Sequence, residues 1–288
     1  MGESITYRVG SHWPGFRGIS NLVIFGASYC DVGYHYNKER PTPSNPLGVP
    51  FPGVCWTEEG PNWVGHLITK YYPHPRFDPS LEEQSQEYMK NPLLVYNYAK
   101  GGDMVDGIER QVETPLVGKK INEGLWTAEN ALFVTWVDIN DCGTPNVDIP
   151  THINKLLGVQ QKLYDAGARN FLLFGIPPLH RSPAGKFSFS SSGRCGFRRE
   201  RADLWNSLLG KEIENFAILH EDVTASLFSP ATTFNRLLDD PTRFGFDVNG
   251  ATIWADHIHP TSRAHDFLAA DLARFLEGIS PRQPGSLG

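Results

Sequence analysis

A serine follows a short apolar stretch close to the start of the sequence. The residues from position 25 onward read Phe-Gly-Ala-Ser-Tyr, which places Ser28 just after a candidate buried strand, Asn21–Phe25. Gly26 permits a tight turn at this point, and a hydroxyl at the carboxyl end of a strand is well placed to attack a bound carbonyl group. Because Gly-x-Ser is a common tripeptide, this segment by itself favours a turn or a helix-capping serine.

An aspartate and a histidine lie three positions apart near the end of the sequence, at Asp256 and His259. A serine nucleophile needs a base that accepts its proton, and the base needs a carboxylate that orients it, so this pair supplies both groups from one loop. Pro260 favours an extended backbone at His259, and Thr261 can cap a following helix. Three alternatives stay open at this point: His257 as the base, a metal site formed by Asp256, His257 and His259, and a polar surface turn.

Two further segments end apolar strands with potential hydrogen-bond donors. Asn140 follows the candidate strand Ala131–Val137, and its side-chain amide can donate to an oxyanion. Gly101 and Gly102 follow the candidate strand Leu93–Asn97, where small residues leave a backbone N–H free to donate to the same oxygen. Each segment alone is typical of an ordinary turn. Together with the serine and the Asp-His pair, however, they complete the set of groups that an acyl-transfer site needs.

The elements that must position these residues alternate along the sequence. Short stretches that are apolar on both faces predict parallel strands covered by helices, and helical periodicity fills much of the sequence between them. The alternation predicts an α/β fold with a single flavodoxin-like domain, in which helices flank a parallel five-stranded sheet. The predicted strands are Asn21–Phe25, Leu93–Asn97, Ala131–Val137, Asn170–Phe174 and Phe216–Asp222, and the predicted helices are Thr151–Ala166, Glu200–Asn215 and Thr261–Glu277.

The length of the chain, 288 residues, suits one large α/β domain, which we expect over residues 21–278. Residues 1–20 are expected to form an N-terminal extension and residues 279–288 a flexible tail. Two long irregular segments interrupt the pattern, the Pro- and Gly-rich Arg40–Gly60 and the Ser- and Gly-rich Arg181–Gly196. Both follow strands, so we expect them to lie over the carboxyl edge of the sheet.

The composition indicates a globular protein and excludes several classes. Hydrophobic residues make up 40% of the chain, charged residues 20%, and the formal charge is -6. Basic residues form no patch, so no nucleic-acid partner is expected, and no apolar stretch is long enough for a membrane span. Absence of a recognisable signal peptide or N-glycosylation site slightly favours an intracellular location, with a secreted mature form as the alternative. The cysteines lack zinc-ligand spacing and are expected to be free thiols, with one disulfide as the alternative; they are Cys30, Cys55, Cys142 and Cys195.

The four segments together resemble the SGNH (GDSL-like) hydrolases, and most of all the fungal acetylesterase branch of that superfamily. In that branch the blocks read roughly Phe-Gly-Asp-Ser-Tyr, Asn-x-Ala-x-Gly-Gly, Trp-x-Gly-x-Asn-Asp and Asp-x-x-His-Pro-Thr, and the similarity extends from Trp13 to about Leu276. The resemblance implies that Ser28 is the nucleophile, His259 the base and Asp256 the group that orients the base.

The resemblance also implies an oxyanion hole formed by the Ser28 N–H, Gly102 and Asn140, with Gly101 as the alternative if its block shifts by one residue. The implied reaction is hydrolysis of carboxylic esters through an acyl-enzyme, without a metal or organic cofactor. Small-molecule or oligosaccharide esters are the expected substrates, with acetyl esters of sugars first among them. Trp56 and Tyr34 are aromatic residues that can stack on a sugar. The oligomeric state is not predicted.

Two positions depart from the family blocks. Ala27 stands where the family has aspartate, and Asp138 stands where it has glycine. An added negative charge near an oxyanion donor is unfavourable unless it is compensated. We therefore hypothesise that Asp138 occupies the space vacated at Ala27, with two independent substitutions as the alternative. The departures also motivate a different class of function, an ester- or glycan-binding protein without turnover, and acyl transfer is a second enzymatic possibility.

Overall fold

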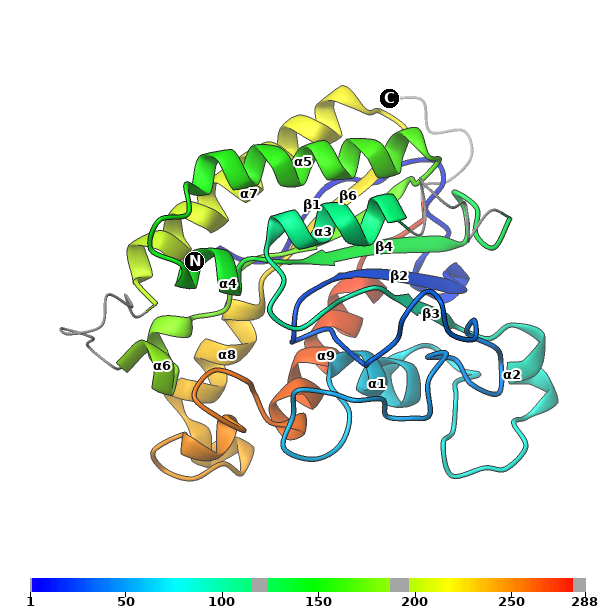
Figure 1. The fold of residues 1–288 in the computed structure, drawn as a ribbon. Coiled ribbons are helices and arrows are strands. Elements are labelled where there is room, and N and C mark those ends of the chain that lie inside the picture. Colours follow the sequence, from blue (N-terminus) through cyan, green and yellow to red (C-terminus); the bar gives the residue numbers. More distant parts are fainter. Residues whose placement is uncertain (1, 115–123, 187–196, 282–288) are drawn as a thin grey trace.

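A six-stranded sheet forms the centre of the fold in the computed structural model, which describes residues 2–114, 124–186 and 197–281 (Figure 1). Its strands are β1 (Ile5–Arg8), β2 (Asn21–Gly26), β3 (Leu94–Asn97), β4 (Ala131–Trp136), β5 (Asn170–Phe174) and β6 (Thr224–Phe228). The strand order is β1-β6-β5-β4-β2-β3. All neighbouring strands run parallel except β1, which is antiparallel to β6. This arrangement confirms the predicted α/β class.

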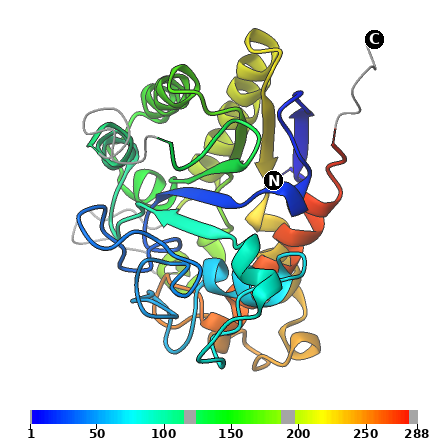
Figure 2. The same ribbon diagram turned by 90° about the vertical axis from the view of Figure 1, so that its right-hand side faces the viewer.

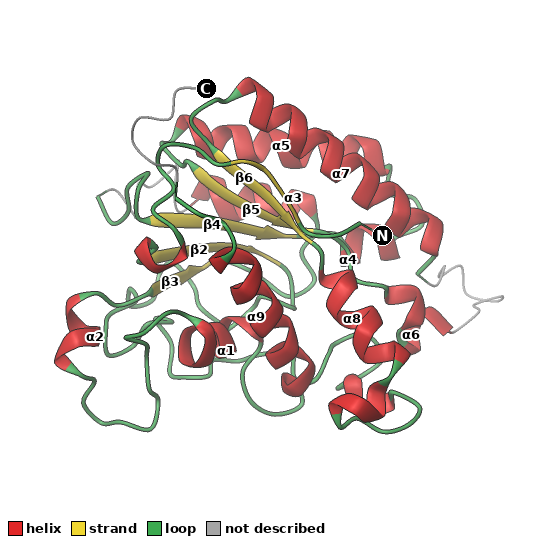
Figure 3. Ribbon diagram, turned by 180° about the vertical axis from the view of Figure 1, so that it is seen from behind, coloured by secondary structure: helices red, strands yellow, loops and turns green. Residues whose placement is uncertain are grey.

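Helices cover both faces of this sheet (Figures 1 and 2). They are α1 (Trp63–His66), α2 (Gln86–Lys90), α3 (Val105–Val112), α4 (Ile139–Gly143), α5 (Ile149–Asp165), α6 (Pro183–Lys186), α7 (Arg199–Leu219), α8 (Pro230–Asp239) and α9 (Ser262–Glu277). On one face α5 packs between α3 and α7, and on the other face α9 packs between α1 and α8 (Figure 3). Both helix layers bury apolar side chains against the sheet, and these side chains together with those of the strands form the core.

Local sequence explains where most of these elements begin. The strands β2, β4, β5 and β6 are buried over their whole length, as expected for strands covered on both faces. The side chain of Asp148 accepts a hydrogen bond from the Thr151 N–H (3.0 Å) and caps α5. Thr261 accepts one from the Ala264 N–H (3.4 Å) and caps α9. The predicted helices at 151–166 and 261–277 therefore closely match α5 and α9.

The predicted strand Phe216–Asp222 is wrong. Helix α7 continues through this stretch to Leu219, and strand β6 begins only at Thr224. Phe216 follows buried Ile213 at helical spacing, and its ring packs edge-on against that of Phe171, with 5.2 Å between centroids. A short apolar run does not by itself distinguish a strand from the buried end of a helix.

The sheet has six strands where the sequence predicted five. The additional strand, β1, lies in the segment 1–20 that was expected to be an extension, and its Ile5 lies opposite Leu227 of β6. Four residues are too few for a recognisable alternation. Because β1 covers an edge of β6 that would otherwise be open, it also protects this edge from pairing with another chain. The domain boundaries at residues 21 and 278 stay a prediction.

Some predictions concern segments that are described only in part. Residues 282–288 of the predicted tail and 187–196 of the second long segment lie outside the described residues, as does Cys195. Ile279 is buried, and its carbonyl accepts a hydrogen bond from the Trp13 indole at 2.9 Å. The other three cysteines, Cys30, Cys55 and Cys142, are free thiols. Among the described residues, no helix is long and apolar enough to cross a membrane.

Candidate active site

Three neighbouring strands end at one edge of the sheet and direct their following loops toward a common region. Strand β2 pairs with both β3 and β4, with Gly26 opposite Trp136 at the strand ends. Because the three strands are parallel, their loops leave the same edge, where sites form in α/β proteins. The loops after β2 and β3 carry Ser28 and Gly102, the helix α4 after β4 carries Asn140, and the loop before α9 carries Asp256 and His259.

Ser28, His259 and Asp256 form one continuous chain of hydrogen bonds. His259 Nε2 lies 2.8 Å from Ser28 Oγ, and His259 Nδ1 lies 2.7 Å from Asp256 Oδ2. Because Nδ1 faces a carboxylate, the neutral ring carries its proton there and leaves Nε2 free to accept the hydroxyl proton. The structure thus brings together the three residues that the sequence singled out, in the order that base-assisted attack by a serine requires.

The loop before α9 holds Asp256 in place through its own backbone. Asp256 Oδ1 accepts hydrogen bonds from the N–H groups of Ile258 (2.8 Å) and His259 (2.7 Å). The Tyr29 hydroxyl donates to the Ile258 carbonyl at 2.5 Å and so ties this loop to the turn after Ser28. Partial burial raises the pKa of Asp256, but the hydrogen bonds from His259 and Ile258 outweigh burial and leave that pKa below its usual value. Asp256 is therefore ionised at neutral pH.

The alternatives that involve His257 gain no support from this geometry. Its side chain is exposed, and within the described part of the chain its ring makes no hydrogen bond. In the same ranges, no group of three or more His, Cys, Asp or Glu side chains is placed to hold a metal ion. Asp256 and His259 contact each other instead.

The loop between β3 and α3, residues 98–104, carries the predicted oxyanion donor Gly102 and is called the oxyanion loop below. Gly102 lies in it with φ +84°, a left-handed conformation that favours glycine. Neither the Ser28 N–H nor the Gly102 N–H makes a hydrogen bond to any other described residue, so both are free to donate. The Gly101 N–H, in contrast, donates to Asp31 Oδ2 at 2.8 Å. The geometry therefore favours Gly102 over Gly101 as the loop's oxyanion donor.

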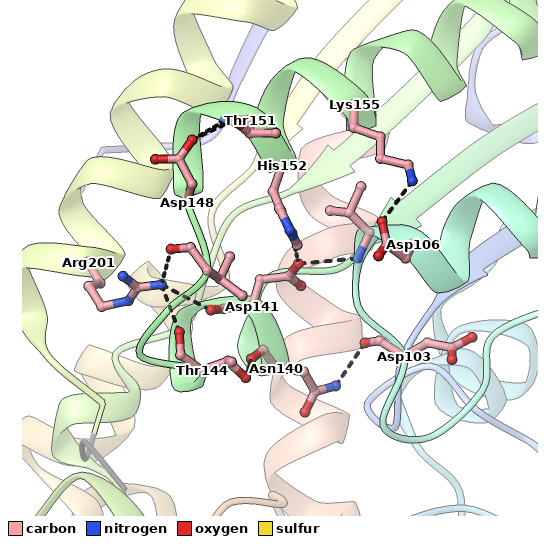
Figure 4. Close-up of polar contacts among 12 residues, drawn as sticks. Asp103, Asp106, Asn140, Asp141, Thr144, Asp148, Thr151, His152, Lys155 and Arg201 are labelled. Carbon is pink, nitrogen blue, oxygen red and sulfur yellow. Dashed lines mark hydrogen bonds and ion pairs between the residues drawn. The ribbon is translucent and has the colours of Figure 1, made fainter. Parts of the chain in front are cut away.

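Asn140 lies at the start of α4 and contacts the oxyanion loop. Its Nδ2 donates to the Asp103 carbonyl at 2.9 Å (Figure 4). An amide nitrogen carries two protons, so one N–H of Asn140 is left to donate to a substrate oxygen. The Asp103 contact fixes the amide orientation and brings Asn140 against the oxyanion loop.

Trp56 forms one wall of the site. From the sequence it was expected only to be an aromatic residue that can stack on a sugar. Its indole stacks on the His259 ring, with centroids 5.1 Å apart and an interplanar angle of 30°. Its Nε1 donates to Asp31 Oδ2 at 3.3 Å. A Cβ atom at Gly101 would lie 2.4 Å from the indole, so glycine is needed there for Trp56 to approach. The Gly-Gly pair and the position in the Pro- and Gly-rich segment were the only sequence signals.

Asn140→Ala is expected to lower kcat by about 10²–10³ and to leave KM nearly unchanged, because the lost donor acts mainly on the oxyanion of the transition state. Steady-state kinetics with a nitrophenyl ester measures both constants. Since Asn140 also contacts Asp103, the unfolding midpoint of the variant is measured alongside. A rise in KM alone would instead assign Asn140 to ground-state substrate binding.

Asp138, one of the two departures from the family blocks, is a buried carboxyl group between β4 and α4. It is 1% exposed, and neither oxygen makes a hydrogen bond of normal geometry with the described residues. Burial, and then the neighbouring Asp141 carboxylate, raise the pKa of Asp138 well above its usual value. The neutral acid is thereby favoured, which lessens the unfavourable charge near Asn140. Ala27 and Asp138 follow the neighbouring strands β2 and β4 and are both buried. That Asp138 occupies the space vacated at Ala27 stays a prediction.

Asp138→Asn is expected to remove part of the pH dependence of stability. A carboxyl group whose pKa rises on folding binds its proton more tightly in the folded state, so the contribution of Asp138 to the free energy of unfolding falls as pH rises above the unfolded pKa of about 3.9. This group contributes a slope of up to about 1.4 kcal/mol per pH unit. Urea unfolding at several pH values between about 4 and 7 should show that the variant becomes more stable relative to the wild type as pH rises. A constant difference over this range would contradict the raised pKa.

A relative of known activity shares most of the length of this chain. An acetylesterase of Thermothelomyces thermophilus is 30% identical over 286 residues, which cover 89% of this chain and 88% of the relative. The chain belongs to the SGNH (GDSL-like) hydrolase superfamily. The resemblance inferred from the four sequence blocks is thereby confirmed. None of the protein-family models compared with the sequence matches it.

Two further similar proteins share a smaller fraction of their sequence with this chain. A GDSL esterase/lipase of Arabidopsis thaliana is 26% identical over 149 residues, covering 46% of this chain and 43% of that relative. Among solved structures, the psychrotrophic esterase EstA of Pseudoalteromonas is similar with a TM-score of 0.48 and 14% identity, covering 89% of this chain and 94% of that one. This SGNH hydrolase is a carboxylic ester hydrolase, as predicted.

Proposed function

We propose that this SGNH esterase cleaves short-chain esters, above all acetyl esters of carbohydrates, through an acyl-enzyme on Ser28. The observation that carries the proposal is the chain of hydrogen bonds from Ser28 Oγ to His259 Nε2 (2.8 Å) and from His259 Nδ1 to Asp256 Oδ2 (2.7 Å). It lies beside free N–H groups of Ser28 and Gly102 and one N–H of the Asn140 amide. Similarity to an acetylesterase supports a short acyl group.

The first half of the reaction transfers the acyl group to the enzyme. Ser28 Oγ attacks the ester carbon while His259 Nε2 accepts the hydroxyl proton, and the carbonyl oxygen becomes an oxyanion held by the three N–H donors. When this tetrahedral intermediate collapses, the bond between the acyl carbon and the alcohol oxygen breaks. His259 then gives its proton to the departing alcohol, and Asp256 stabilises the imidazolium in between.

The second half of the reaction frees the acyl group. A water molecule gives a proton to His259 Nε2 and attacks the acyl carbon on Ser28. The second tetrahedral intermediate uses the same oxyanion donors, and its collapse breaks the bond to Ser28 Oγ, which takes the proton back from His259. The products are a carboxylic acid and the resting enzyme, so each turnover consumes one ester and one water.

A cavity of about 380 Å³ beside the oxyanion loop supports a carbohydrate as the alcohol portion. Aromatic rings next to charged hydrogen-bonding groups suit a sugar, which has apolar faces and a rim of hydroxyls. The rings of His35 and Tyr36 stack with centroids 4.5 Å apart. The residues that line this cavity include Tyr34, His35, Tyr36, Lys100, Asp103 and Arg110. Lys100 and Asp103 flank the two loop glycines in the sequence, so the cavity borders the loop that carries Gly102.

Tyr36→Ala is expected to raise KM for an acetylated oligosaccharide by about 5- to 10-fold, as for loss of one aromatic stacking contact. Its kcat/KM for nitrophenyl acetate should stay at the wild-type value, because that ester has no sugar to fill the cavity. The comparison of the two substrates is the measurement. Equal losses on both would mean that Tyr36 supports the site as a whole and that the cavity does not bind the sugar.

The experiment that tests the proposed function is a panel of nitrophenyl esters of increasing acyl length and of acetylated oligosaccharides, with Ser28→Ala as the blank. A fluorophosphonate probe should label the wild type at Ser28 and leave the variant unlabelled. Added acceptor alcohol distinguishes hydrolysis, which gives the free acid, from acyl transfer, which gives a new ester. If the wild type showed no labelling and no turnover, the protein would be one that binds esters or glycans without cleaving them.

A further inference from the structure

Two consecutive residues of α4 hold the end of the oxyanion loop (Figure 4). Asn140 Nδ2 donates to the Asp103 carbonyl at 2.9 Å, and Asp141 Oδ1 accepts a hydrogen bond from the Val105 N–H at 3.2 Å. Val105 is the first residue of α3, which follows the oxyanion loop directly. Helix α4 therefore contacts the chain on both sides of Met104, just after Gly102.

Asp141 supplies a helix cap that the local sequence lacks. Met104 occupies the capping position before α3, and its side chain makes no capping hydrogen bond. The first N–H groups of a helix have no partner within it, and a buried N–H without a partner is costly. Asp141 is fully buried and reaches Val105 from a neighbouring element, so it does what an N-cap side chain otherwise does.

The position of Asp141 is fixed from the opposite side by two long helices (Figure 4). His152 of α5 places its Nδ1 2.5 Å from the same Asp141 Oδ1. Arg201 of α7 donates from its guanidinium to the backbone carbonyls of Asp141 (3.2 Å) and Cys142 (3.0 Å). The same guanidinium reaches the carbonyls of Thr144 and Val147 beyond α4. Helix α4 thus connects α5 and α7 to the oxyanion loop through hydrogen bonds.

We infer that Asp141 is a positioning residue for the oxyanion hole: by capping α3, it holds the loop that carries Gly102 in place. The inference rests on the proposed function, in which the Gly102 N–H and the Asn140 amide donate to one oxygen. Because Asn140 and Asp141 are adjacent on α4, the same short helix presents one donor itself and fixes the segment that presents the other. Asp141 touches no reacting atom, so its effect passes through the distance between these two donors.

Asp141→Ala tests the inference from the acceptor side. The variant should lower kcat for nitrophenyl acetate by about 10- to 100-fold, as for a small displacement of a catalytic donor, and leave KM nearly unchanged. Asp141→Asn keeps an oxygen for the Val105 N–H and should retain most of the turnover. If Asp141→Asn loses as much as Asp141→Ala, the cap is not what matters and the inference is wrong.

Val105→Pro tests it from the donor side. Proline has no N–H, is well tolerated at the first position of a helix, and requires an extended residue before it. Met104 meets that requirement with φ -106° and ψ -173°. The variant should lower kcat as Asp141→Ala does, and the double variant Val105→Pro/Asp141→Ala should be no slower than the slower single variant. Additive losses would show that Asp141 acts elsewhere, which overturns the inference.

Asp148→Ala is the matched control, because Asp148 caps α5 through the Thr151 N–H (3.0 Å) and has no contact with the oxyanion loop. It should lower the unfolding midpoint and keep the wild-type kcat. Hydrogen exchange of the 101–106 backbone gives a readout that needs no turnover: exchange should accelerate in Asp141→Ala and not in Asp141→Asn. Unchanged exchange in Asp141→Ala overturns the inference. A wild type without esterase turnover would refute the proposed function and leave this exchange test standing.

Discussion

Ser28→Ala is expected to lower kcat for any ester substrate by about 10⁵-fold or more, because no other nucleophile among the described residues is hydrogen-bonded to His259. The hydroxyl of Ser28 lies 2.8 Å from His259 Nε2, and the side chain is only 7% exposed. Loss of one small oxygen there leaves no large cavity, so the unfolding midpoint should hardly move. The measurement is steady-state turnover of a nitrophenyl ester, with fluorophosphonate labelling as a second readout.

Ser20→Ala is the control for this prediction. Ser20 lies just before β2, at the end of the strand opposite to Ser28, and its hydroxyl accepts a hydrogen bond from the Asn21 side chain at 3.2 Å. Turnover and labelling should be those of the wild type. If Ser28→Ala kept its turnover, or its label, another nucleophile would have to be sought and the proposed acyl-enzyme abandoned.

His259→Ala should lower kcat by a factor of similar size, since Ser28 is then left without a base. The two residues act as a unit, so the double variant Ser28→Ala/His259→Ala should be scarcely slower than either single variant. Labelling by a fluorophosphonate should also slow in His259→Ala, because that reaction needs the same activated hydroxyl. Turnover and labelling rates of the three variants are the measurements.

His257→Ala is the matched control in the same loop. The side chain is exposed, whereas the backbone carbonyl of His257 accepts a hydrogen bond from the Ala184 N–H (2.7 Å) that the substitution leaves intact. Its kcat should equal that of the wild type. The opposite pattern, a crippled His257→Ala and a nearly silent His259→Ala, would assign the base to His257 and reject the proposed triad.

The sequence predicted those parts of the site that depend on residues close together in the chain or directly after a predicted strand. Asp256 and His259 come from one loop, so their spacing allowed the contact that the structure has, although His257 stayed open as an alternative base. Ser28, Gly102 and Asn140 each follow a buried strand, and parallel strands deliver such loops to one edge. Their roles are still predictions. The contact of Trp56 with the His259 ring could not be predicted, because it depends on the path of a long irregular segment that no local pattern fixes.

The fold was predictable where elements are long or fully buried, and not where they are short. Strand β5 was predicted with the bounds Asn170–Phe174 that the structure has. The apolar run after Phe216 was assigned to a strand because periodicity does not resolve the last turn of a buried helix. Strand β1 was missed because its pairing with β6 is decided by the edge that β6 leaves open, a property of the assembled sheet.

The partners at this edge of the sheet and in the site come from distant parts of the chain. Ile5 pairs with Leu227, and 231 positions separate Ser28 from His259. Contacts between such distant segments form late in folding, because the entropy of closing the loop must be lost before the contact gains anything. During synthesis Ser28 leaves the ribosome early and has no base until the loop before α9 docks. The first appearance of turnover in a refolding reaction therefore marks the completion of the whole domain, later than any signal from its local helices.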